Sequence, residues 1–348
     1  MSAAEPAHPE ETNMRIGSRQ FPGALDRRWC LAALAGLGLF CALPAQGQAT
    51  YPDHAMRMIV PWPAGQATDL GGRLIAQELS RELGQPVVVE NKAGAGGTIG
   101  TDMAARATPD GYTILMASSG PVSVSPLMQK LNYNPDKDLE PVAMVGLSPY
   151  TLVTAPDFPA KNLDEFLKLV KASPGKYTFA SSGTGATAHL IAESFNGTAG
   201  IKAIHIPYKG SSPALTDVAG GQVAYSVETA ASTMPLIRAG KLKAYGVSLK
   251  KGSSVTPGLA PFASNPALKD FDLGAWIGVM VPAGTPAPVV ARLSVAIDKI
   301  MKKPEVQQAF GTIAIEVDYR DAPEFRKYLQ SISKEFDRVI KANNIKAE

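Results

Sequence analysis

Short apolar runs alternate with amphipathic segments along most of this 348-residue chain. The first cycle has an apolar run at 58–60, a turn with prolines and a glycine at 61–65, and a segment at 70–83 in which leucine recurs at helical spacing. Such alternation is typical of parallel sheets, because each helix carries the chain back across the face of the sheet. The pattern therefore predicts an α/β fold with parallel sheets.

The alternation falls into two blocks. Pro149 interrupts a long apolar run at 142–153, and a new series of strand and helix cycles follows it. A later apolar run at 276–281 is placed to carry the chain back, and Thr285 and Pro286 then predict a helix start as its N-cap and first residue. The chain is therefore expected to cross twice between two units.

These crossings predict two lobes. We assign residues 50–149 and 276–348 to the first lobe and residues 150–275 to the second. A terminal helix at 323–343 carries an apolar stripe that we assign to the core. Two α/β lobes joined in this way form a hinged clamshell, with the ligand cleft between the lobes at the carboxyl ends of the strands.

The N-terminal segment has the features of a secretory leader. An apolar run at 29–45 follows Arg27 and Arg28 and precedes the small residues that end at Ala49. We predict a signal peptide over residues 1–49, cleaved near Ala49, and hence a periplasmic protein; the alternative is an uncleaved N-terminal anchor. The export route, Sec or twin-arginine, and the true start codon stay open.

Cysteine usage and charge exclude several classes of function. Cys30 and Cys41 both leave with the predicted leader, so the mature protein has no thiol for a disulfide, a nucleophile or a thiolate metal site. Lys and Arg number 34 against 31 Asp and Glu, and no run of basic residues is interleaved with aromatics. A nucleic-acid partner is therefore not expected.

A series of short motifs resembles one receptor family. The stretches 60–69 (VPWPAGQATD) and 84–91 (GQPVVVEN) are similar to the Bug-type substrate-binding receptors of tripartite tricarboxylate transporters. Further similar motifs follow in the family's order at 94–97, 109–113, 181–183, 205–210, 220–223 and 282–286. The resemblance covers essentially the whole mature chain, from about Tyr51 to Glu348.

The resemblance implies a periplasmic receptor with the two-lobed periplasmic-binding-protein, or Venus-flytrap, fold. Such a receptor captures a small organic acid and presents it to the membrane permease subunits of the transporter. It implies no cofactor and no catalysis. In the family, the turn matching 61–69 and the loop matching 181–189 hold the ligand from opposite lobes through main-chain amides, hydroxyls and ordered water. We expect a monomer.

The residues themselves favour an anion site for a physical reason. Each of these loops leaves a strand and enters a helix, so free backbone N–H groups and the positive end of the helix face the cleft. The candidate ligand-binding residues are Trp62, Ala64, Gly65, Gln66, Ser119, Ser181, Thr184, Thr187, His189, Tyr208, Lys209 and Glu228.

Several candidates have a second interpretation. Trp62 is expected as a wall of the site, or else packs over its own loop, and Lys209 is either a cation at the cleft or a surface lysine. Asp69 is expected to fix the turn without touching the ligand, since a carboxylate repels an anion. Gln66 stands where the resembled family usually has glycine, so it adds a contact or narrows the pocket. The hydroxyls of 181–187 also serve local turns.

Glu228 follows a strand predicted at 223–227, where the resembled family commonly has aspartate. A buried carboxylate needs a donor or a proton, and it repels a multiply charged anion. We therefore expect a mono- or dicarboxylate, aromatic acids included, in preference to citrate. The identity of the acid stays open.

No catalytic or metal-binding pattern accompanies these residues. The sequence has no G-x-S-x-G elbow and no paired histidine motif, so we expect neither an active site nor a metal site. The segment 183–188 matches G-x-G-x-x-A, but the next strand ends at His205-Ile206-Pro207 and not in a ribose-binding acid. The remaining alternatives are a sensory receptor that docks ligand-loaded onto the kinase of a two-component system, and an exported enzyme on the same scaffold.

Overall fold

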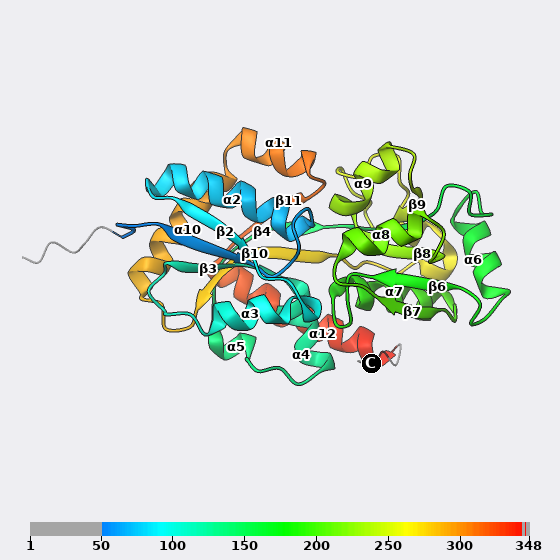
Figure 1. Cartoon of the computed structure of the whole chain (residues 1–348), viewed down its shortest axis with the longest axis horizontal. Coiled ribbons are helices and arrows are strands. Elements are labelled where there is room, and N and C mark those ends of the chain that lie inside the picture. Colours follow the sequence, from blue (N-terminus) through cyan, green and yellow to red (C-terminus); the bar gives the residue numbers. More distant parts are fainter. Residues whose placement is uncertain (1–50, 343–344, 346–348) are drawn as a thin grey trace, which may run out of the picture. The chain divides into compact units, whose positions relative to one another are not determined.

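The computed structural model describes residues 51–342 and 345. The predicted leader and its cleavage site lie outside the described residues. Strands of the described part form two sheets, each flanked by helices (Figure 1). This arrangement confirms an α/β fold with two lobes.

The first sheet has six strands in the order β11-β4-β10-β3-β1-β2. These strands are β1 (Met56–Val60), β2 (Val87–Asn91), β3 (Thr113–Ser118), β4 (Leu139–Ser148), β10 (Ala275–Pro282) and β11 (Glu316–Asp321). Its helices are α2 (Ala67–Leu83), α3 (Thr98–Ala105), α4 (Ser125–Met128), α5 (Pro135–Asp138), α10 (Ala287–Met301), α11 (Pro304–Thr312) and α12 (Ala322–Ala342). In Figure 1, α2, α10 and α11 lie on one side of this sheet, and α3, α5 and α12 lie on the other.

The second sheet has five strands in the order β7-β6-β8-β5-β9. These strands are β5 (Tyr150–Thr154), β6 (Thr178–Ser181), β7 (Ile204–Pro207), β8 (Tyr225–Thr229) and β9 (Lys243–Val247). Its helices are α6 (Leu163–Lys171), α7 (Thr187–Ala199), α8 (Ser211–Ala219) and α9 (Ala230–Arg238).

The period-two alternation of the strands supplies both sides of the first core. Met58 and Val60 face the cluster that contains Ile75 and Leu79 of α2, whereas Ile59 between them faces the cluster that contains Phe325 of α12. Successive side chains of a strand point to opposite faces, so a strand covered by helices on both sides is apolar throughout. Continuous apolar runs are therefore the sequence signature of these strands.

The sheets are mixed, so the prediction of parallel sheets is wrong in part. Strand β1 runs parallel to β2 and β3, and β6 runs parallel to β7 and β8. Strand β10 is antiparallel to β3 and β4, β11 is antiparallel to β4, and β5 is antiparallel to β8 and β9. Strand β4 passes into β5 through Pro149 alone, without a helix. A strand that enters directly from the other sheet arrives from the opposite end, which reverses its direction.

Some predicted boundaries are wrong by one or two residues. Strand β8 starts at Tyr225 because the amides of Gln222 and Val223 bond to the Asp217 carbonyl and keep those residues in the preceding turn. Pro286 is the N-cap of α10, and the Thr285 hydroxyl donates to the Pro282 carbonyl at 2.7 Å instead of capping the helix. Helix α11 and strand β11 were not predicted.

Helix α12 contributes to both cores. Phe325 near its start belongs to a first-lobe cluster, whereas Phe336, Val339 and Ile340 near its end pack with the second-lobe core. The apolar stripe is core, as predicted, while the residue boundaries of the two lobes stay a prediction. Within residues 51–342, no helix is both long enough and apolar enough to cross a bilayer.

Candidate functional site

The turn between β1 and α2 is held by a buried carboxylate. Asp69 is about 1% exposed; its Oδ2 accepts the Gly65 amide at 2.9 Å and the Arg73 guanidinium at 3.0 Å, and its Oδ1 accepts the Asn91 side-chain amide at 2.8 Å. Burial alone would raise the pKa of Asp69, but these hydrogen bonds and the charge of Arg73 hold it below its usual value. Asp69 therefore fixes the turn.

Trp62 occupies the same turn. Its indole Nε1 donates to the Ser118 hydroxyl at 2.9 Å, and its ring is about 7% exposed. The Trp62 carbonyl accepts the side-chain amide of Asn91 at 2.9 Å. Trp62 is therefore held by β2 through its main chain and by β3 through its ring.

The loop between β6 and α7 bonds mostly to its own lobe. The Ser181 hydroxyl bonds to His205 Nε2 at 2.7 Å and accepts the Gly183 amide at 3.2 Å. His189 is buried; its Nδ1 accepts the Gly185 amide at 3.4 Å, and its ring stacks on His205 with the centroids 4.1 Å apart. Ser181 and His189 therefore bond within the second lobe and line neither cavity described below.

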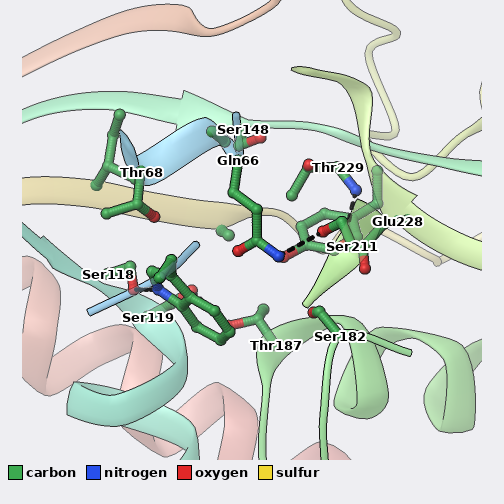
Figure 2. A pocket seen from close by; sticks show the side chains of 15 residues that line it. Gln66, Thr68, Ser118, Ser119, Ser148, Ser182, Thr187, Ser211, Glu228 and Thr229 are labelled. Atoms are coloured by element: carbon green, nitrogen blue, oxygen red, sulfur yellow. Dashed lines mark hydrogen bonds between the residues drawn. The ribbon is translucent and has the colours of Figure 1, made fainter. Parts of the chain in front are cut away.

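Three of the hydrogen bonds between the lobes lie at these loops. Gln66 Nε2 donates to the Ser211 hydroxyl at 2.9 Å (Figure 2). The hydroxyls of Ser119 and Thr187 bond at 2.7 Å, and the Ser125 hydroxyl donates to the Gly185 carbonyl at 3.1 Å. The lobes are therefore closed on each other at this point.

A small cavity of about 30 Å³ lies between these contacts. It is large enough for about one water molecule. Its lining residues come from both lobes and are Trp62, Gln66, Ala67, Thr68, Ser118, Ser119, Ser148, Tyr150, Ser182, Thr187, Ser211, Glu228, Thr229, Ala275 and Ile277. Hydroxyls predominate, and Glu228 is the one charged side chain among the lining residues that the structure describes.

Glu228 is about 1% exposed and lies within β8. Its Oε1 accepts the Thr229 amide at 3.1 Å, and its Oε2 has no hydrogen-bond partner among residues 51–342. Burial raises the pKa of Glu228 from about 4.5 to about 7, and the Thr229 amide and the nearby Ser211 and Ser182 offset part of that rise. The carboxyl group is therefore half-protonated near neutral pH.

Four helices begin at the small cavity. Gln66 is the N-cap of α2 and Thr229 that of α9, while Thr187 and Ser211 are the first residues of α7 and α8. In none of the four does the N-cap side chain bond to a helix amide. Four partial positive charges thus converge on a site that has no cationic side chain among its described lining residues.

A second cavity of about 330 Å³ adjoins the first, and both are lined by Trp62 and Ser182. It is also lined by the glycine-rich segment 94–97 and by 207–210. Within the latter, the Tyr208 hydroxyl donates to Asp217 at 2.5 Å, and Lys209 is exposed. A cationic residue therefore lines the larger cavity, and none is among the described residues that line the smaller one.

The structure brings most of the predicted site residues together. Trp62, Gln66, Ser119, Thr187 and Glu228 line the small cavity. Trp62, Thr184, Tyr208 and Lys209 line the larger one. Ala64 and Gly65 are exposed and line neither cavity. The roles of all these residues in ligand binding stay a prediction.

Several lining residues were missed by the sequence analysis, namely Thr68, Ser118, Ser148, Ser211 and Thr229, whereas Ser182 belongs to the hydroxyl-rich loop 181–187 that it had singled out. Ser211 had a usable signal, since it directly follows the glycine of a strand-to-helix loop. Ser148 had none, because its place in the cavity depends on where β4 ends. In the part of the chain that the structure describes, no group of three or more His, Cys, Asp or Glu side chains is placed to hold a metal ion.

Comparisons with known proteins point to one receptor family. The model of the tripartite tricarboxylate transporter family receptor matches residues 72–345. Protein BugT of Bordetella pertussis is 40% identical over 285 residues, which are 80% of this chain and 87% of BugT.

Two solved structures are similar to this chain over most of its length. The periplasmic binding protein BugD is 34% identical with a TM-score of 0.80, covering 86% of this chain and 100% of BugD. MatC of Rhodopseudomonas palustris, solved with bound malate, is 31% identical with a TM-score of 0.78, covering 83% of this chain and 100% of MatC.

Proposed function

Because the chain belongs to the tripartite tricarboxylate transporter receptor family, whose members are receptors and not enzymes, we propose that it binds a small mono- or dicarboxylic acid in the periplasm and delivers it to the permease subunits of such a transporter. The motifs between Val60 and Pro286 support the same assignment.

One observation carries the proposal. Four helix N-termini without side-chain caps converge on a closed cavity between the lobes, and the described lining residues include no lysine, arginine or histidine. Backbone amides and hydroxyls in this arrangement bind a carboxylate by hydrogen bonds and by the positive ends of the helices. An aliphatic ligand would leave these donors unsatisfied, and a neutral sugar would accept their hydrogen bonds but bring no negative charge to the helix ends.

The geometry also limits ligand size. The closed cavity of about 30 Å³ is smaller than any organic acid, so the Gln66–Ser211 and Ser119–Thr187 contacts must open for binding. Gln66 occupies space that a glycine would leave free. We therefore expect small acids to bind better than citrate. The malate bound to the related MatC supports a ligand of about the size of malate.

Calorimetric titration of the mature protein with succinate, malate, aspartate, adipate and citrate tests the proposal. At least one of the smaller acids should bind, and at about 100 times its Kd it should stabilise the fold by about 2.7 kcal/mol. Absence of heat and of thermal stabilisation with every acid would contradict the proposal.

A further inference from the structure

Glu228 is a buried carboxylate in the wall of the small cavity. Figure 2 shows it beside Ser211 and Thr229, with the Gln66 side chain reaching toward the same point. One carboxylate oxygen accepts the Thr229 amide, and the other has no partner among the described residues. Leaving such an oxygen unsatisfied is costly, so a partnerless carboxylate oxygen in the wall of this cavity points to a partner that the ligand supplies.

No neighbouring element offers a counter-charge. Thr151 of β5 lies opposite Glu228 in the sheet register, and Gln66, Ser182 and Ser211 approach from α2, the β6–α7 loop and α8. Tyr150 is the one titratable group among the cavity residues that lie near it, and burial and Glu228 raise the pKa of Tyr150 well above 10. Tyr150 therefore stays neutral, and Glu228 faces the cavity without a cation.

The charge of the ligand decides whether Glu228 is tolerated. A dicarboxylate in this cavity would place further negative charge against Glu228, which would then have to take up a proton. An acid that also carries an ammonium group would pair with both the helix N-termini and Glu228. Its carboxylate meets the four helix N-termini, and its ammonium donates to the free oxygen of Glu228.

We propose, building on the proposed receptor function, that this receptor selects amino acids, with Glu228 binding the ligand ammonium and the helix N-termini binding its carboxylate. Glu228 is then a specificity-determining residue that recognises the one group by which an amino acid differs from its plain dicarboxylate analogue.

Three four-carbon acids with the skeleton of malate test the assignment. Succinate has no donor beside its carboxylates, L-malate has a hydroxyl and L-aspartate has an ammonium group. In calorimetry at about pH 7.5, wild type should bind aspartate at least about tenfold more tightly than succinate, with malate between them. Glu228→Gln should remove this preference, and Glu305→Gln, which changes an exposed glutamate in α11, should leave it unchanged.

Proton linkage in the wild type provides a measurement that needs no variant. Pairing with an ammonium favours ionised Glu228, so aspartate binding should release about half a proton at about pH 7 and weaken about tenfold between about pH 8 and pH 6. Binding of succinate should instead take up protons. Titration in buffers of different ionisation enthalpy measures how many protons are released or taken up on binding.

The outcomes separate the two proposals. Tight binding of succinate by wild type, unchanged in Glu228→Gln, would overturn the amino-acid assignment while supporting a carboxylate receptor. Proton uptake on aspartate binding would overturn the assignment as well. Failure of all three acids to bind, together with adipate and citrate, would contradict the receptor function itself.

Discussion

Replacing Glu228 by glutamine is expected to stabilise the ligand-free protein in a pH-dependent way. The carboxyl group is about 1% exposed and one oxygen has no partner among the described residues, so its ionised form is unfavourable in the folded state. Glutamine has nearly the same shape, and its side-chain oxygen still accepts the Thr229 amide. The substitution thus removes the charge and keeps the packing.

The magnitude follows from the pKa of Glu228, which burial raises from about 4.5 to about 7 on folding. Below about pH 4.5 the group is neutral in both states and costs nothing. As the pH rises through this window, the folded state binds more protons than the unfolded state, so folding stability falls. Above about pH 7 the full cost is reached, and the difference between the two pKa values corresponds to about 3 kcal/mol.

Urea unfolding of ligand-free wild type, Glu228→Gln and the surface control Glu305→Gln, measured from about pH 5 to about pH 8.5, checks this expectation. Glu228→Gln should exceed wild type by no more than about 1 kcal/mol at the acidic end and by about 3 kcal/mol at the alkaline end. The control should follow wild type throughout. A stability difference that stays constant with pH would refute the reasoning, because it would mean that Glu228 does not titrate within this window.

Three further predictions concern closure, the site and export. Gly96→Ala should weaken acid binding about tenfold or more, because a Cβ there would lie 2.7 Å from the Thr184 carbonyl of the other lobe. Gly221→Ala is the control for backbone strain, since Gly221 has a similarly positive φ and open space around its Cβ. Equal affinities in the two variants would contradict an effect on lobe closure. Trp62→Phe should keep affinity yet lose the ligand-dependent tryptophan emission, since Trp276 is fully buried against Phe325; a signal that persists would move the ligand away from Trp62. Intact mass of the periplasmic protein should place its N-terminus at or within a few residues of Thr50, and a species that retains Met1 or Met14 would count against cleavage.

Much of the fold was predictable because its signals are local. Period-two and helical patterns of apolar residues arise from the geometry of one strand or one helix, so they located most elements to within a few residues. Pro149 marked the passage between the sheets, since β4 ends one residue before it and β5 begins one residue after it. Asp69 was also interpretable, because its partner Gly65 lies four residues away in the same turn.

Strand direction could not be predicted in the same way. The apolar pattern of a strand is the same whether its neighbours run parallel or antiparallel, and β5, β10 and β11 therefore gave no local sign of their direction. Direction depends on the path of the chain between the two sheets. Only the tertiary structure contains that path.

The sequence by itself determined the family, the α/β class and the residues that border the loops. The tertiary structure decided which of these residues contact each other. Gln66 bonds to Ser211, 145 residues further along the chain. His189 and His205 stack on each other, and neither lines the small cavity. The partnerless oxygen of Glu228 is likewise invisible in the sequence, because burial and the absence of a partner depend on every element packed around a group. A sequence pattern records what each segment prefers, whereas the chemistry of a cavity depends on the segments that enclose it.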